Sequence, residues 1–355
     1  MFLAWNEIKQ NKLRFSLIIG VLFLIAYLVM FLSGLANGLQ DMNKSAIEKW
    51  DADAVVLTSE SDKSLPQSDM KKSDFDTKQV DKAEPIGVLN SIASKDDDSS
   101  SVALFGIDSN GFIMPDVVEG KAFQKDNEVV AGSSLKDEGF KLGDTVKLSS
   151  SDEKLKITGF TDDAKFNAAP VLYGTMDTFL DVKYGPAAKE NEDHLNGYVI
   201  RDAHLDDIKV KDDFELVDTQ SFIEHLPGFK EQNLTLNMMI YFLFAISAFI
   251  LAIFLYVLTI QKVSIFGVMK AEGISSKYLA SSVINQTLIL AISGVVLGFI
   301  LTVVTGLFLP AAVPVSFSYL DMFMYAVVLV VVAVLGALFS VRTIVKIDPL
   351  EAIGG

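Results

Sequence analysis

The chain has 355 residues, of which 50% are hydrophobic, and a mean hydropathy of +0.38, yet its formal net charge is −15. A soluble domain is less apolar than this, so the apolar and acidic residues must occupy different parts of the chain. The absence of cysteine excludes disulfide bonds and thiolate metal sites, but it does not indicate a compartment.

The first predicted elements are an N-terminal amphipathic helix (1–14) and a membrane span (15–35). The run 15–35 contains no Asp, Glu, Lys or Arg. A bilayer core about 30 Å thick needs roughly 20 helical residues, so this run is long enough to cross it. It is also longer than the apolar part of a signal peptide, and further apolar runs follow it. An uncleaved membrane anchor is therefore the favoured interpretation.

The long segment 36–237 carries the acidity of the chain. It holds 40 Asp and Glu against 22 Lys and Arg, a net charge of −18, whereas the rest of the chain carries +3. A solvated surface explains most of this excess. The acidic runs lack the spaced ligands and the glycine of a calcium loop, so no calcium site is predicted from them.

The same segment is predicted to fold as mixed α and β structure. Stretches rich in β-branched and aromatic residues predict strands at 52–59, 101–107 and 197–201. The polar stretch 68–81 is predicted to be weakly helical. A small β-rich lobe (120–182), with a turn at Gly143 and Asp144, is expected as an insert in a larger α+β lobe. A helix capped by Asp218 or Thr219 should then return the chain to the second span.

Three further spans are predicted at 238–260, 280–309 and 322–339, with a short loop (310–321) and a tail (340–355). Lys and Arg flank the N-terminus, the segment 261–279 and the tail, but the short loop has none. By the positive-inside rule, both termini and 261–279 are cytoplasmic and 36–237 is extracellular. The predicted fold class is an α-helical, multi-pass plasma-membrane protein with four transmembrane helices and an extracytoplasmic α+β domain.

The segment 261–279 between the second and third spans predicts a short amphipathic helix. If 261–272 is helical, Ile265, Phe266 and Met269 share one face and Lys270 lies off that face. The helix could rest its apolar face on the bilayer interface. Alternatively, it docks into a partner and transmits motion to the spans, which a flexible loop could not do.

Helix-ending signals support this prediction. Gly273 is well placed to end the helix, and Ser275 or Ser276 to cap the next one.

Four sequence blocks point to a family. They are "AWNEIKQNKLRFSLI" at the first span, "VAGSSLKDEGFKLGDTVKL" with "LKITGF" in the long segment, "SIFGVMKAEGISSKYL" between the second and third spans, and "RTIVKIDPLEAI" in the tail. In this order they resemble the blocks of MacB/FtsX-type ABC transporter permeases. The resemblance covers the whole chain and assigns the coupling segment to Ile265, Phe266, Met269, Lys270 and Gly273.

This resemblance implies a non-catalytic permease subunit that forms a homodimer in the membrane lipid. A separate dimer of ABC ATPase subunits would bind ATP and Mg²⁺, because the chain itself contains no G-x-x-x-x-G-K-[ST] sequence. ATP-driven closure of that dimer would push the two 261–279 helices together and move the outer domains, a mechanism called mechanotransmission. No catalytic residues, intrinsic cofactor or nucleic-acid partner are predicted.

The block "FLSGLANGL" and the compact outer domain resemble the HrtB-type haem exporter permeases of Gram-positive bacteria. This resemblance implies efflux of haem from the outer leaflet, and thus haem detoxification, with haem as cargo. No metal site is predicted beyond ligation of the haem iron. The candidate haem contacts are Met30, Glu48, Met238, Met239, Tyr241 and His225.

Other interpretations stay open. The methionines could be ordinary packing residues and His225 a solvated side chain. An FtsX-like protein that activates a cell-wall hydrolase should expose an apolar patch on its outer lobe. A haem exporter should instead have an apolar cleft between protomers at the outer leaflet. An exporter of an antimicrobial peptide or antibiotic would keep the mechanism and change the cargo.

Overall fold

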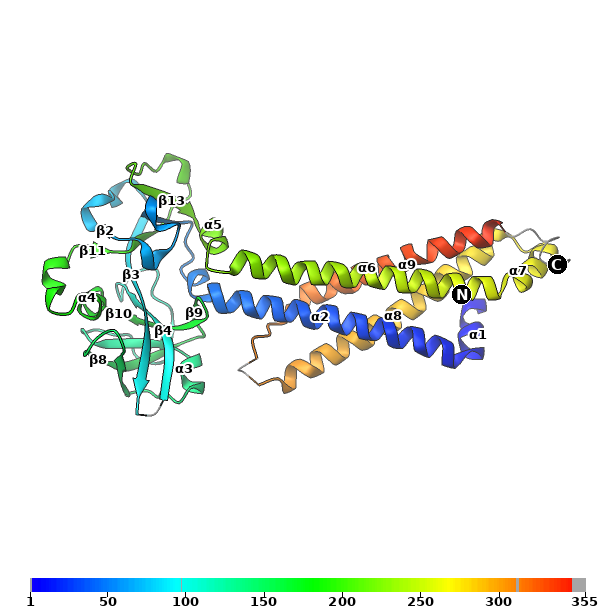
Figure 1. The fold of residues 1–355 in the computed structure, drawn as a ribbon, viewed down its shortest axis with the longest axis horizontal. Helices are drawn as coiled ribbons and strands as arrows, with labels where there is room; N and C mark the ends of the chain where they lie inside the picture. The colour runs from blue at the N-terminus through cyan, green and yellow to red at the C-terminus, as the bar shows by residue number, and fades with distance from the viewer. Residues whose placement is uncertain (1, 97, 311–312, 347–355) are drawn as a thin grey trace. The chain divides into compact units, whose positions relative to one another are not determined.

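The computed structural model describes residues 2–96, 98–310 and 313–346, and the chain divides into two compact units (Figure 1). The first unit comprises the residues up to 39 and those from 233 onward, and it is built of helices. The second comprises residues 40–232 and is an α/β domain.

Helices form at all four apolar runs of the sequence. Within the described residues, the four helices α2, α6, α8 and α9 are long and apolar enough to cross a membrane, which confirms the prediction of four apolar helices. The helices are α1 (Phe2–Gln10), α2 (Lys12–Glu48), α3 (Ser134–Asp137), α4 (Met176–Tyr184), α5 (Thr219–Glu224), α6 (Phe229–Gln261), α7 (Val263–Ala271), α8 (Ser276–Phe308) and α9 (Tyr319–Lys346).

Two glycines one turn apart bring α8 against the backbone of α2. A Cβ atom added at Gly298 would lie 2.7 Å from the Cβ of Ala26 and 2.9 Å from the backbone nitrogen of Tyr27. A Cβ at Gly294 would lie 2.6 Å from the Cβ of Leu22. Small residues four apart are a common way for membrane helices to approach closely. The two helices therefore pack backbone to backbone over this turn.

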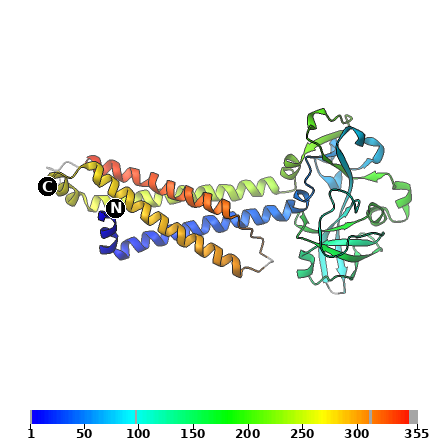
Figure 2. The same cartoon turned by 180° about the vertical axis from the view of Figure 1, so that it is seen from behind.

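A second glycine pair, on α2, receives the loop between α8 and α9 (Figure 2). The ring of Phe317 lies against Gly34, and the backbone of Pro314 lies against Gly38. The amide of Ser316 donates a hydrogen bond of 2.9 Å to the carbonyl oxygen of Gly34. These contacts fix the loop that precedes α9 to α2.

The α/β domain is built on one mixed sheet. Its strand order is β13-β1-β12-β3-β4-β10-β6-β8-β5, with β7 joined to β3 and β8, and β9 joined to β10, while β2 and β11 form a separate pair. The strands are β1 (Ala54–Thr58), β2 (Met70–Lys71), β3 (Lys82–Lys95), β4 (Asp98–Gly106), β5 (Val117–Gly120), β6 (Glu128–Gly132), β7 (Thr145–Leu148), β8 (Lys154–Thr161), β9 (Lys165–Phe166), β10 (Ala169–Gly174), β11 (His194–Leu195), β12 (Gly197–Arg201) and β13 (Phe214–Asp218).

The predicted strands at 52–59, 101–107 and 197–201 correspond to β1, β4 and β12. The prediction of weak helicity at 68–81 is wrong, because this stretch forms β2 and two short 3-10 turns. β2 pairs with β11 instead, in a register that no local sequence pattern indicates. Tertiary pairing thus overrides a weak helical preference.

The region 120–182 shares both an apolar core and the main sheet with the rest of the domain, since Ala93, Val102 and Leu104 of β3 and β4 belong to the same core. Val129, Leu155, Ile157 and Phe160 are all buried in this core. β10, from the same region, pairs in parallel with β4. The predicted small β-rich lobe is therefore continuous with the larger one rather than a separate body.

Gly298→Leu should destabilise the membrane unit, because its side chain would meet backbone atoms of α2 that cannot move aside. Overpacking of this kind costs about 2 kcal/mol. The matched control is Gly20→Leu, since a Cβ at Gly20 meets nothing within 4 Å. Thermal unfolding in detergent should show a lower Tm for Gly298→Leu and an unchanged or higher Tm for Gly20→Leu. Equal Tm values for the two variants would contradict the close α2–α8 contact.

Candidate functional site

α7 is a separate short helix whose start is fixed by an ion pair. The chain leaves α6 at Gln261 and bends at Lys262, where α7 begins. The Nζ of Lys262 lies 2.7 Å from a carboxylate oxygen of Glu7 in α1, and these side chains are only 16% and 21% exposed. Removing either partner would leave a largely covered charge unpaired, which is costly. The bend between α6 and α7 is thus held by a residue 255 positions away in the chain.

Gly273 ends α7 as the sequence predicts. Its φ of +94° is in the region that favours glycine, and its amide donates to the carbonyl of Lys270. The amide of Ile274 donates 2.9 Å to the carbonyl of Met269. This pair of hydrogen bonds is a Schellman motif, which stops a helix sharply. Ser275 then caps α8 by accepting a hydrogen bond from the amide of Tyr278.

The apolar residues of α7 divide between two faces. Phe266 is 3% exposed and packs against Leu279 and Val283 of α8, with Met269 partly buried beside it. Ile265, in contrast, is 58% exposed. The prediction that Ile265, Phe266 and Met269 share one face is wrong for Ile265, because neighbouring helical residues point about 100° apart. The start of α8 covers only the side of Phe266 and Met269.

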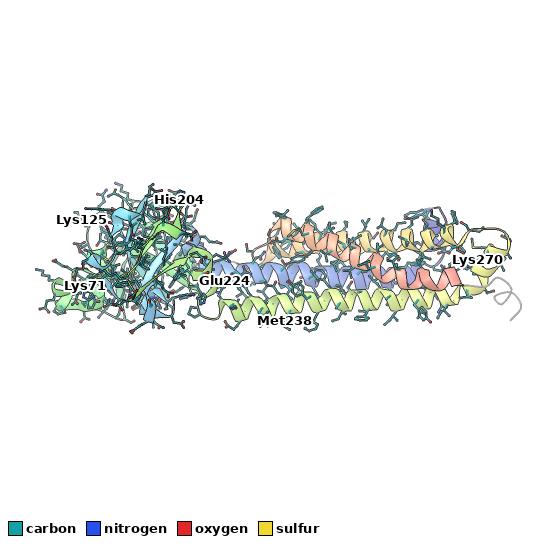
Figure 3. All side chains as sticks on the ribbon, turned by 90° about the horizontal axis from the view of Figure 1, so that it is seen from above. Lys71, Lys125, His204, Glu224, Met238 and Lys270 are labelled. Carbon is teal, nitrogen blue, oxygen red and sulfur yellow. The ribbon has the colours of Figure 1, made fainter. Side chains whose placement is uncertain are left out.

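The outward face of α7 therefore includes a residue that the sequence analysis did not single out. Val268 is 43% exposed and lies three positions after Ile265, on the same side of the helix. Lys270, in the last turn (Figure 3), is partly buried and engages in an interaction with the surrounding protein. A cation in the last turn interacts favourably with the negative end of the helix dipole.

The predicted haem contacts in the membrane unit have different environments. Met238, Met239 and Tyr241 on α6 are 46%, 49% and 67% exposed, and Figure 3 labels Met238 on this helix. Met30 on α2 has no exposed surface and packs with Ile240 and other residues inside the helical unit. The three α6 residues can therefore contact a molecule outside this chain, whereas Met30 cannot do so in this arrangement.

The other two predicted haem contacts lie in the α/β domain. Glu48 is the last residue of α2 and pairs with Lys44 at 2.6 Å, one helical turn away. His225 ends α5 and is exposed. Its Nδ1 donates to the carbonyl of Ser221 at 2.7 Å, and its Nε2 lies 3.4 Å from the Nζ of Lys63. Binding of iron by Nε2 would require the contact with Lys63 to break.

Asp218 caps α5, as the sequence analysis allowed. Its carboxylate accepts a hydrogen bond of 2.9 Å from the amide of Ser221. Hydrogen bonds from the hydroxyl and the amide of Ser221 lower the pKa of Asp218 below its usual value. The capped helix holds His225 in a defined place in the α/β domain.

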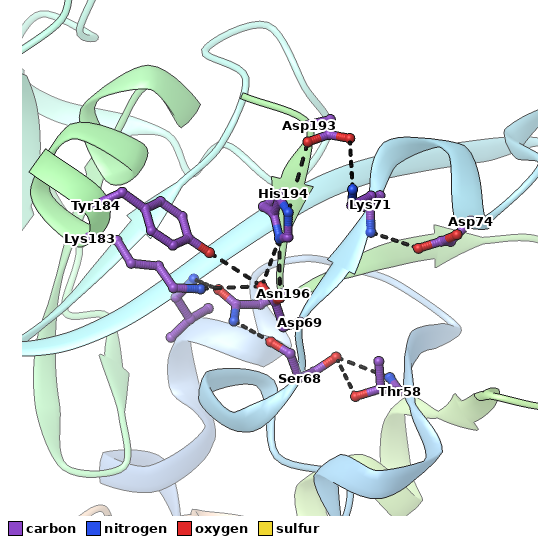
Figure 4. A network of polar contacts seen from close by, with 11 residues as sticks. Thr58, Ser68, Asp69, Lys71, Asp74, Lys183, Tyr184, Asp193, His194 and Asn196 are labelled. Atoms are coloured by element: carbon purple, nitrogen blue, oxygen red, sulfur yellow. Dashed lines mark hydrogen bonds and ion pairs between the residues drawn. The ribbon is translucent and has the colours of Figure 1, made fainter. Parts of the chain in front are cut away.

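A polar network surrounds another histidine, His194 (Figure 4). Its Nδ1 lies 3.1 Å from a carboxylate oxygen of Asp69, which also pairs with Lys183 at 3.6 Å. The hydroxyl of Tyr184 donates to the same carboxylate at 3.4 Å. These contacts tie α4 and β11 to the loop before β2, which indicates a structural role.

Two hollows lie elsewhere. An apolar groove of about 370 Å³ runs between α8 and α9, and a polar cleft of about 570 Å³ in the α/β domain is lined by residues that include Asp69, Asp212 and Asp213. No predicted haem contact lines either hollow. Within the described residues, no group of three or more His, Asp or Glu side chains could hold a metal ion.

Comparisons with known families identify the class of protein. Residues 15–207 match the family model of the MacB-like periplasmic core domain, and residues 237–349 match that of the FtsX-like permease C-terminal. The chain belongs to the MacB/FtsX-type ABC transporter permeases, and it is a membrane protein with an extracellular domain. Such a permease is a transporter component and is not itself catalytic.

Individual proteins show which members of this family the chain is similar to. The chain is 29% identical to a putative hemin transport system permease protein HrtB from Staphylococcus haemolyticus, over 100% of this chain and 99% of that protein. It is 28% identical, with the same coverage, to a protein of the same name from Staphylococcus epidermidis. Among solved structures, the extracellular domain of the ABC-type transporter YknZ from Gram-positive bacteria matches 47% of this chain and 99% of that one, at 14% identity and a TM-score of 0.35.

Phe266→Ala should loosen α7 from α8, because it removes the central side chain of their small apolar contact. We expect the local opening of α7 to become easier by about 3 kcal/mol. Hydrogen exchange of the amides in 263–274 should therefore accelerate. Ile265→Ala is the matched control, since its exposed side chain contributes little to this contact. If the two variants exchanged at the same rate, the assignment of the two faces would be wrong.

Proposed function

We propose that this permease works as a homodimer with a separate ABC ATPase dimer and exports haem from the outer leaflet of the membrane. The observation that carries the mechanism is the geometry of α7, a helix fixed at both ends and along one face. Its remaining face, with Ile265 and Val268, is open to a partner. The similarity of the whole chain to hemin transport permeases supports the cargo.

The outward face of α7 has the character of a docking surface. Exposed apolar side chains that lie next to each other on one helix face can form an interaction surface, whereas single scattered ones need no partner. In this proposal both chain termini and α7 are cytoplasmic, which the Lys and Arg at this end of the spans support. The ATPase would cover Ile265 and Val268 and act on α7 directly. It would also supply the ATP site, because this chain lacks a phosphate-binding loop.

Packed contacts connect α7 to the spans. Phe266 holds α7 to α8, and Gly294 and Gly298 hold α8 to α2. α2 is one uninterrupted helix from Lys12 to Glu48. A displacement of α7 would therefore move α8 and α2 as well, because little of the motion would be absorbed by flexible side chains. This is the basis for proposing mechanotransmission to the extracellular domain.

Haem suits the exposed side chains of α6. Methionine sulfur and tyrosine oxygen both serve as axial ligands of haem iron. Met238, Met239 and Tyr241 are open to the surroundings of the chain, so a flat apolar ligand between two copies could contact them. Met30 is a packing residue in this proposal, and Glu48 and His225 are peripheral contacts.

The alternative of an FtsX-like activator of a cell-wall hydrolase has less support. Such a protein needs a broad apolar patch on its extracellular domain. In the described part of that domain, the large apolar side chains with substantial exposure are Ile92, Val118 and Leu142. These scattered residues favour a transporter over an enzyme activator.

A reconstituted complex tests the proposal. Haem should raise ATP hydrolysis by the permease and its ATPase in vesicles, and the haem absorption band should leave the membrane in an ATP-dependent manner. Ile265→Asp should reduce the haem-stimulated rate about tenfold or more, because docking would bury an unpaired charge. Val118→Asp, on the extracellular domain, is the control and should leave the rate unchanged. If an antimicrobial peptide but not haem stimulated ATP hydrolysis, the cargo would be the peptide and the proposed mechanism would be unchanged.

Met238→Leu with Met239→Leu should weaken haem binding to the purified permease by about tenfold and alter its absorption spectrum, because sulfur ligands are lost at similar side-chain volume. Met324→Leu is the matched control, since Met324 is a 51% exposed methionine on α9. Met30→Leu should also leave the spectrum unchanged. A spectrum altered by Met30→Leu and not by the α6 variant would reverse the assignment.

A further inference from the structure

α1 and the first turn of α2 form a basic and apolar edge, here defined as Trp5, Lys9, Lys12, Leu13 and Arg14. Trp5 is 50% exposed and the Nζ of Lys9 lies 5.4 Å from the centre of its ring. Leu13 is 82% exposed, and Lys12 and Arg14 on either side of it are exposed as well. Exposed cationic and apolar side chains thus lie close together in the chain, at the junction of α1 and α2.

The opposite side of α1 is anchored, so this edge cannot rotate inward. Glu7 pairs with Lys262, and Ile8 packs against the apolar cluster that includes Phe15 and Leu258. Figures 1 and 2 show α1 running across the direction of α2. A helix held crosswise at the end of a span lies along the membrane surface, where one face can meet the headgroups.

Among the residues that the structure describes, the three cations of the edge have no acidic partner. Among the described residues, no ion pair involves Lys9, Lys12 or Arg14. They come directly before the apolar run that starts at Phe15, which places them at the depth of the lipid headgroups. Trp5 is of the residue type that favours this depth. Each basic residue near an anionic leaflet strengthens its attraction to that leaflet by about 1 kcal/mol, or roughly fivefold in the binding constant.

We propose that this edge binds the headgroups of anionic membrane lipids, with Lys9, Lys12 and Arg14 as the cationic contacts. Trp5 and Leu13 enter the interface beside them. The bound lipids hold α1 in place on the side that Glu7 does not reach. The proposal is independent of the cargo and of the ATPase.

The chain contains two tryptophans, Trp5 and Trp50, and Trp50 is fully buried in the α/β domain. Trp5 is therefore a native reporter. The full-length protein is placed in mixed vesicles of phosphatidylcholine and phosphatidylglycerol, with bromine on the acyl chains of one lipid or the other at the same mole fraction. Brominated phosphatidylglycerol should quench the Trp5 emission about twofold more than brominated phosphatidylcholine. Trp5→Phe should abolish this difference, leaving only Trp50.

In the triple variant Lys9→Gln, Lys12→Gln and Arg14→Gln, the two brominated lipids should quench the Trp5 emission equally. The matched control removes three exposed, unpaired cations of the α/β domain, in Lys121→Gln, Lys125→Gln and Lys154→Gln, and should keep the difference. If the triple variant inserts poorly, Lys12→Gln alone should still reduce the difference. Equal quenching in the unchanged protein would overturn the proposal. The proposal would also be overturned if neither brominated lipid quenched Trp5 and only the partner ATPase shielded Trp5 from acrylamide. That result would assign the edge to a protein contact.

Discussion

The close approach of α8 to α2 is the contact on which the rest of the membrane unit depends. At Gly294 and Gly298 no side chain separates the helices, and the neighbouring atoms of α2 are backbone and Cβ atoms. Lipid tails are as apolar as leucine, so helices in a bilayer associate by packing rather than by the hydrophobic effect. A glycine contact of this kind is short and stiff. α7 is attached to one of these helices and α1 precedes the other, so the glycine pair sets the position of both.

Three different interactions make α7 rigid, and each acts at a different point. The ion pair of Lys262 with Glu7 fixes its start, the Schellman motif at Gly273 fixes its end, and Phe266 fixes which side faces α8. An amphipathic helix with only one of these could slide or turn when pushed. With all three, α7 is held to α8 at its start, its end and one face, so that in the proposed function a force on Ile265 would be carried into α8. The ion pair also connects α7 to α1. α7 is therefore linked to the first span both through α1 and through α8.

The sequence predicts the parts of this arrangement that depend on local patterns. The four apolar runs, the glycine that ends α7 and the caps by Ser275 and Asp218 are such parts, because length, φ and a side-chain oxygen determine them locally. Which face of a helix is covered depends on its neighbours instead. Periodicity alone could not show which of Ile265 and Phe266 is covered, or that Met30 is buried while Met238 is open. The glycine spacing on α8 was available as a signal for helix contact, but the Glu7–Lys262 pair was not, since nothing local connects residues so far apart.

The filled interior of the helical unit restricts how any cargo can move. Ala26, Val29 and Met30 have no exposed surface, and they pack with α6, α8 and α9 in one apolar cluster. Protein interiors packed in this way leave no room for a molecule of the size of haem. A route through the middle of one chain would require the α2–α8 contact to separate, although its backbones touch. In the proposed function, the cargo would therefore travel along the outer surface of the helices or between two copies, and the exposed side chains of α6 lie on such a surface.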